Sequence, residues 1–154
     1  MSYQLLKSIH LLGVTLFLGN IIVTAAWKAL ADRTGTPAVV AYAQRLVSLT
    51  DVAFTAVGAA LIAISGLLMA GGHAAIFSTA WLSWGYGLFI ASGALWIFIL
   101  IPIQVKQARL ARGFQDAIEI PGQYWRLARL WAVFGTIATL LPLANLYLMV
   151  FKPA

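Results

Sequence analysis

The chain has 154 residues, of which 62% are hydrophobic and 9% charged, and its mean hydropathy is +0.93. So little polar material cannot cover a soluble globule of this length, and a soluble protein is excluded. The formal net charge of +6 therefore indicates membrane topology and no nucleic-acid partner. Since cysteine is absent, disulfides, thiolate metal sites and thiol catalysis are excluded as well.

Four apolar stretches are long enough to cross a bilayer, because a helix needs about 20 residues to span a ~30 Å hydrocarbon core. They cover about 3–27, 52–71, 81–103 and 130–150. The length permits one domain, residues 1–154, and we expect an all-α integral membrane protein, a four-helix up-and-down bundle. The first stretch is too long for the apolar part of a signal peptide, and its basic residues follow the run, so we expect it to be retained.

The connections after the first and third helices have structure of their own. Thr36 and Pro37 have the residue types of an N-cap and a first helical position, and the pattern over 37–48 predicts a short helix at the membrane interface. The third helix is expected to continue inside to about residue 112, and Pro121 leads into the fourth. The basic residues in these connections predict contact with anionic lipid headgroups.

Charge placement predicts the orientation. Eight of the ten cations fall in these two connections or at their edges: Lys28, Arg33, Arg45, Lys106, Arg109, Arg112, Arg126 and Arg129. Only Lys7 and Lys152 lie on the other side, and the connection 72–80 carries no formal charge. By the positive-inside rule we expect the two basic connections on the cytoplasmic side, and both termini and the 72–80 connection on the periplasmic or extracellular side.

Small and polar residues recur along one face of each predicted helix. The stripe of the first helix is His10, Gly13, Phe17, Asn20, Thr24 and Trp27, at alternating spacings of three and four residues. In lipid such residues permit close helix approach and hydrogen bonding between helices, so packing explains most of them. Asn20 and Asp51 are accordingly expected to stabilise the bundle and not to perform chemistry. Homo- or hetero-oligomers within the membrane are also compatible with such faces.

His10 stands apart, because an imidazole inside a membrane-spanning segment is costly without a partner. Taking Trp27 and Asp51 as the inner ends of their helices, a rise of 1.5 Å per residue places His10 and Met69 at one level near the outer surface. His73 lies about one turn farther out by the same count. Lys7 precedes His10 by three residues.

Two chemistries and one plain alternative fit this arrangement. A b-type haem could take His10 as axial ligand and Met69 or His73 as the second, with Gly13 making room and Lys7 near the propionates. Copper(I) could bind His10 and Met69, because thioether and imidazole ligands suit it. Alternatively, His10 bonds a carbonyl or hydroxyl of a neighbouring helix and the methionine fills space.

The segments LLKSIHLLGVTLFLGNIIVTAAWKALADRTGTP, WLSWGYGLFIASGALWIFILIPIQVKQARLA and YLMVFKP resemble the bacterial family of predicted integral membrane proteins known as domain of unknown function 2269. The resemblance covers essentially the whole chain, and the ADRTG and LMVFKP segments are its most specific parts. It implies a membrane topology and no particular reaction.

The KSIHLLGVTLFLGN segment is similar to the first helix of CopD-type copper-resistance proteins and of haem-binding membrane protoporphyrinogen oxidases. This similarity implies that His10 is a haem ligand. Those oxidases also use a lysine near the start of their third helix, whereas WLSWGYG has neither lysine nor histidine. The leading hypothesis is electron transfer, or oxidation of a membrane-soluble substrate, at a b-type haem. The alternatives are a copper-binding or copper-passing protein and a non-enzymatic structural membrane subunit.

Overall fold

The structure is a computed structural model that describes residues 2–114 and 116–153, with the side chains of 73–75 left out. The described part is helical without strands, as predicted for an all-α membrane bundle. In chain order the elements are α1 (Tyr3–Thr34), α2 (Pro37–Thr50), η1 (Asp51–Ala56), α3 (Val57–Ala70), α4 (His73–Ser78), α5 (Ala80–Leu95), η2 (Trp96–Leu100), α6 (Ile101–Phe114) and α7 (Gly122–Phe151).

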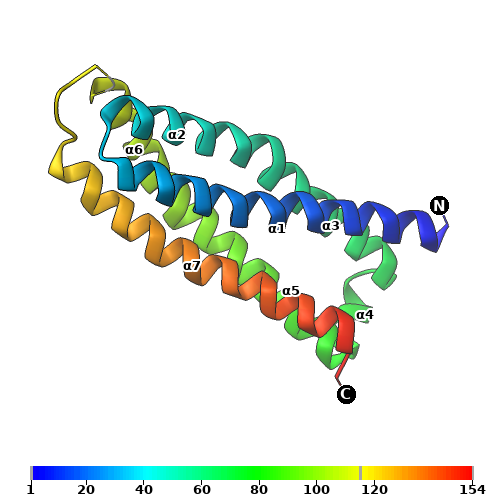
Figure 1. Cartoon of the computed structure of the whole chain (residues 1–154). Helices are drawn as coiled ribbons and strands as arrows, with labels where there is room; N and C mark the ends of the chain where they lie inside the picture. Colours follow the sequence, from blue (N-terminus) through cyan, green and yellow to red (C-terminus); the bar gives the residue numbers. More distant parts are fainter. Residues whose placement is uncertain (1, 115, 154) are drawn as a thin grey trace.

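These elements form four long apolar rods, each long enough to cross a membrane (Figure 1). The π-helical segment η1 joins α2 to α3 without a break, and η2 joins α5 to α6. The rods thus cover Tyr3–Thr34, Pro37–Ala70, Ala80–Phe114 and Gly122–Phe151.

Residues at the rod ends explain where each helix starts and stops. Ser2 caps α1 by accepting a hydrogen bond from the Leu5 amide, and Gly35 ends it with φ of 62°. Pro37 occupies the first turn of α2, where its missing N–H costs nothing. Gly71 and Gly72 end α3 with φ of 77° and 109°, conformations that favour glycine.

The rods extend beyond the predicted apolar runs, which corrects three boundaries. The first helix continues past residue 27 to Thr34, and the fourth begins at Gly122 instead of about residue 130. The predicted interfacial helix over 37–48 is instead the first part of the second rod. Hydropathy marks only the lipid-facing length of a helix, whereas these extensions are held by packing against one another.

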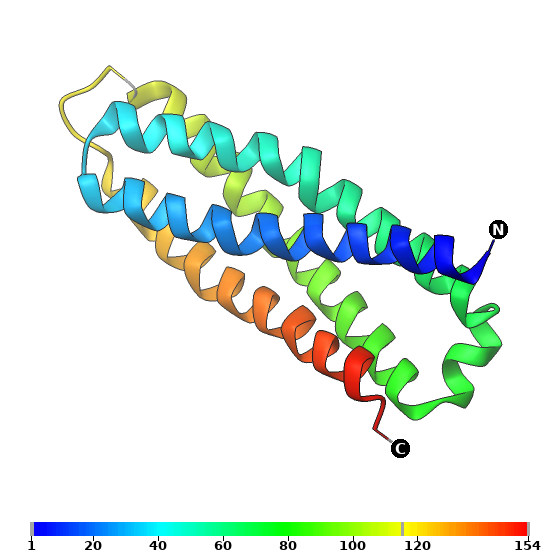
Figure 2. The same cartoon turned by 45° about the vertical axis from the view of Figure 1, so that its right-hand side comes forward.

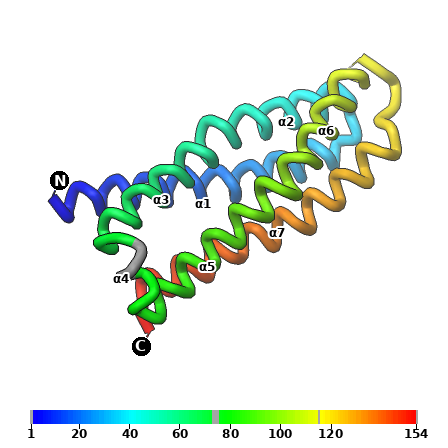
Figure 3. The backbone as a smooth tube through the Cα atoms, turned by 180° about the vertical axis from the view of Figure 1, so that it is seen from behind, coloured from blue at the N-terminus to red at the C-terminus, as the bar shows by residue number. Residues whose placement is uncertain are grey.

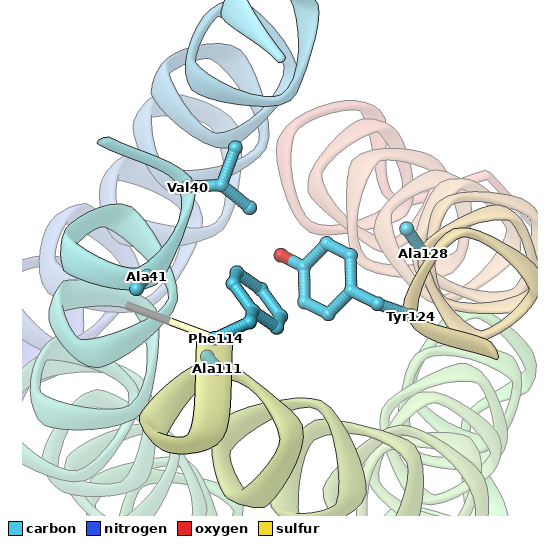
Figure 4. Packing of buried hydrophobic residues seen from close by; sticks show 6 residues of the cluster. All are labelled: Val40, Ala41, Ala111, Phe114, Tyr124 and Ala128. Atoms are coloured by element: carbon cyan, nitrogen blue, oxygen red, sulfur yellow. The ribbon is translucent and has the colours of Figure 1, made fainter. Parts of the chain in front are cut away.

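That packing forms a small core at one end of the bundle. Val40 and Ala41 of α2, Ala111 and Phe114 of α6, and Tyr124 and Ala128 of α7 make one buried cluster (Figure 4). The rings of Phe114 and Tyr124 meet edge to face, with centroids 5.2 Å apart. The cluster therefore joins three rods at the end where the chain turns at residues 35–36 (Figures 1 and 4).

Both termini and α4 lie at the opposite end, as Figures 1 and 2 show. Here the rods separate into two pairs, α1 with α3 and α5 with α7 (Figure 3). In the described part, no Cα atom of α3 lies within 8 Å of α5 or α7. The pairs come together toward the middle, where the rings of Phe17 and Phe89 lie 6.4 Å apart between centroids.

Glycines set the distance within each pair. A Cβ on Gly58 would lie 2.8 Å from the Gly13 carbonyl oxygen and 2.8 Å from the Phe17 nitrogen, so α1 and α3 touch through their backbones. In the other pair, a Cβ on Gly85 would lie 2.7 Å from Asn145 Oδ1. Such close contact is the usual packing of small residues in lipid, and the predicted packing role is confirmed for Gly13 of the first helix.

The Gly58 contact gives a direct prediction. Gly58→Ala is expected to lower the free energy of unfolding by about 1–3 kcal/mol, because the new methyl group overpacks against rigid backbone atoms. Gly19→Ala is the matched control on α1, since a Cβ there meets nothing within 4 Å. Thermal unfolding in detergent, followed by circular dichroism, measures both. A Gly58→Ala variant as stable as the control would contradict the backbone contact.

Candidate functional site

His10 lies on the face of α1 that packs against α3. Its Nδ1 is 3.0 Å from the hydroxyl oxygen of Ser65, a residue that is 1% exposed. A Cβ on Gly66 would lie 3.3 Å from the His10 Cε1, so the ring rests directly on α3. The Ile62 carbonyl is a further acceptor near the ring. A serine, a glycine and a carbonyl thus hold the ring on α3.

The hydrogen bonds of Ser65 favour one tautomer of His10. The Ser65 hydroxyl lies within hydrogen-bond distance of the Leu61 carbonyl, one turn earlier in α3, and can donate its one hydrogen there. In that arrangement it accepts from His10, and we infer that Nδ1 is the protonated nitrogen. In this tautomer Nε2 has a free lone pair, which is the form in which a neutral imidazole binds a metal.

The plain alternative for His10 is confirmed in its first part, because the imidazole does bond a hydroxyl of a neighbouring helix. This bond explains how the membrane-spanning segment tolerates the side chain. It occupies only one ring nitrogen. Metal-ligating histidines commonly donate the other N–H to an oxygen in the same way, so packing and ligation are compatible at His10.

Gly13 does not make room for a cofactor. A Cβ on Gly13 would lie 3.0 Å from the Gly58 carbonyl oxygen and 2.9 Å from Leu61 Cβ, so α3 already fills the space beside this glycine. The expected slot was wrong because the absence of a side chain serves helix contact here. Any planar group at His10 must lie outside the α1–α3 contact.

Met69 is not level with His10. The ring of His10 lies against Ser65 and Gly66, and Met69 follows Ser65 by four residues, about one turn along α3. The error arises from the assumed inner boundary: Thr24, and not Trp27, faces the end of α2, where its hydroxyl is 3.5 Å from that of Thr50. A shift of three residues is about 4.5 Å of helix rise.

The structure places only one of the other two predicted site residues, Lys7 and His73, with its side chain. Lys7 is exposed on α1, three residues before His10 and toward the end with the termini. His73 begins α4, but its side chain lies outside the described residues, so its relation to His10 stays a prediction. Within the described part, no group of three or more histidine, cysteine or acidic side chains is arranged to hold a metal.

The other half of the α1 stripe builds a hydrogen-bonded network around Asp51. The Asn20 amide donates to Thr55 Oγ1 at 2.8 Å and to the Asp51 carboxylate at 3.3 Å. The Thr55 hydroxyl donates to the same carboxylate at 3.0 Å. Gln104 and Trp96 face this carboxylate from the third rod. The network joins three segments, as a stabilising role for Asn20 and Asp51 requires.

A second polar cluster, centred on Lys28, was not predicted. Lys28 is 1% exposed, and its Nζ donates to the Asp32 carboxylate at 2.9 Å and to the Tyr124 hydroxyl at 2.9 Å. The ammonium also lies over the rings of Tyr124 and Trp131, 5.1 and 5.6 Å from their centroids. The sequence analysis counted this lysine among the loop cations. Its i, i+4 spacing from Thr24 and Asp32 was the available signal that it continues the buried stripe.

Comparison with known proteins finds one family, which covers nearly the whole chain. A family model described as predicted integral membrane protein (DUF2269) matches residues 4–153. The chain belongs to this family. No curated protein and no solved structure matches it. The DUF2269 match confirms the family resemblance and the membrane class, and it does not support the more distant similarity to CopD-type proteins and haem-binding oxidases.

Proposed function

We propose that this DUF2269 protein binds a b-type haem through His10, near the end of the bundle that carries both termini. The observation that supports the proposal is the His10–Ser65 hydrogen bond, since it fixes the ring on α3 and leaves Nε2 as the metal-binding nitrogen. A b-type haem supplies one-electron chemistry, so the reaction class is electron transfer or oxidation of a membrane-soluble substrate. We also propose that the protein lies in a bacterial inner membrane with this end of the bundle on the outer side.

The residues around His10 fit such a group in two respects. Ser65 fixes the ring orientation from α3, in the position of an outer-shell partner. Lys7 is one helical turn away and exposed, so its ammonium is available to a propionate.

The test is the cofactor content of the wild-type protein. Purified from cells supplied with a haem precursor and copper, it is expected to show a Soret band and about one haem per chain. If the protein is colourless and holds one copper(I), the haem hypothesis is wrong and the copper-binding hypothesis replaces it. If the protein contains neither haem nor copper, both hypotheses are wrong and the structural-subunit hypothesis replaces them.

One further variant tests whether Met69 is the second axial ligand. A thioether ligand raises the haem potential. Met69→Leu therefore lowers the midpoint potential if Met69 binds the iron and leaves it unchanged if Met69 only packs. A potentiometric titration of the bound haem distinguishes the two cases.

A further inference from the structure

A groove of about 330 Å³ lies between α2 and α6, at the bundle end remote from the termini. Small side chains leave this space open, since Ala41, Ala108 and Ala111 line the groove. One arginine from each helix, Arg45 and Arg112, also lines it, and both are exposed. Among the residues that the structure describes, no acidic side chain lines the groove. The site is therefore positively charged and formed jointly by two rods.

Gln44 supplies the second, independent feature of this groove. It lines the groove yet is 0% exposed, and its Oε1 lies 3.4 Å from the Tyr124 hydroxyl. Its Nε2 has no hydrogen-bond partner in the described part. Because buried amide donors are nearly always paired, an acceptor bound in the groove would satisfy this nitrogen. Ser48 is no competing donor, since its hydroxyl donates to the Gln44 carbonyl.

Toward the other end of the bundle, the same two helix faces become apolar. Val52 follows Ser48 by four residues and is 70% exposed, and Val105 precedes Ala108 by three and is 44% exposed. Residues at these spacings share a face. A positively charged groove with an exposed valine beyond it on each helix matches a phospholipid better than a free anion or an acidic peptide.

We propose that this groove binds the headgroup of an anionic phospholipid. Arg45 and Arg112 take the phosphate oxygens in charge-assisted hydrogen bonds, and Gln44 Nε2 donates to the same group. One acyl chain follows Val52 and Val105 into the bilayer. The general lipid contact expected of the basic connections is thereby narrowed to one groove and one lipid class.

The test uses the full chain in detergent, titrated with phosphatidylglycerol and followed by native mass spectrometry and thermal unfolding. The wild type is expected to retain one phosphatidylglycerol and to be stabilised by it. The Arg45→Gln/Arg112→Gln variant should bind it at least tenfold more weakly. The matched control is Arg33→Gln/Lys106→Gln, which removes the same charge from exposed residues outside the groove and should bind as the wild type does.

Three outcomes would overturn the proposal. The first is equal weakening in both double variants, which would show unspecific charge attraction. The second is equal binding of phosphatidylcholine, and the third is stabilisation by inorganic phosphate alone to the same extent. Should the groove variant fail to fold, Arg112→Lys replaces it. This variant keeps the charge but loses the bidentate geometry, and undiminished lipid retention would then contradict the site.

Discussion

Lys28→Met is expected to lower the free energy of unfolding by about 3 kcal/mol, because it removes the cation of a buried pair. The substitution keeps the length of the side chain but leaves the Asp32 carboxylate and the Tyr124 hydroxyl without their common donor. It also removes the cation from the faces of Tyr124 and Trp131. Since Asp32 retains 19% exposure and can recruit water, the loss should lie at the lower end of the range for broken buried pairs.

Arg33→Met is the control for this prediction, since Arg33 lies on the same helix and is exposed. It should change stability by less than about 0.5 kcal/mol, as surface substitutions usually do. Thermal unfolding of both variants in the same detergent decides the matter. Equal stability of the two variants would show that the Lys28 cluster does not hold the rods together.

His10→Ala is expected to abolish haem binding while the helical content remains, because it removes the proposed axial ligand and only one side chain of the α1–α3 contact. Ser65→Ala should keep the haem but bind it about 10- to 100-fold more weakly, since outer-shell partners of metal-binding histidines have effects of that size. Absorbance at the Soret band per protein chain, with circular dichroism alongside, measures both variants.

Met149→Leu is the matched control, because Met149 packs on Gly85 in the α5–α7 pair, away from His10. It should keep the full haem complement. A Soret band of undiminished intensity in His10→Ala would assign the haem to another residue and withdraw the role given to His10.

The membrane class and the four helices could be predicted from the sequence, because long apolar runs and few charges are nearly sufficient to define them. The packing role of the α1 stripe could also be predicted, and its members Gly13, Phe17, Asn20 and Thr24 are all buried. These features depend on composition and on the 3.6-residue period alone, so no tertiary information was needed.

The helix register and the distant partner of Lys28 could not be predicted in this way. Hydropathy treats Lys28 as the end of an apolar run, whereas its partner Tyr124 lies 96 residues away in the chain. The level of Met69 depended on which residues of α1 and α3 face each other, and Gly13 opposite Gly58 is a property of the assembled pair. Contacts of this kind are set by tertiary packing, which one sequence does not reveal.

Imidazole rescue of His10→Gly tests the central claim most directly, because it separates ligation from packing. The variant purified without imidazole is expected to lack haem. Addition of haem and imidazole should restore a Soret band, since the free base occupies the space of the lost side chain and binds iron in its place. Wild-type haem content in His10→Gly without imidazole, or no restoration at saturating imidazole in a folded variant, would contradict His10 as the ligand.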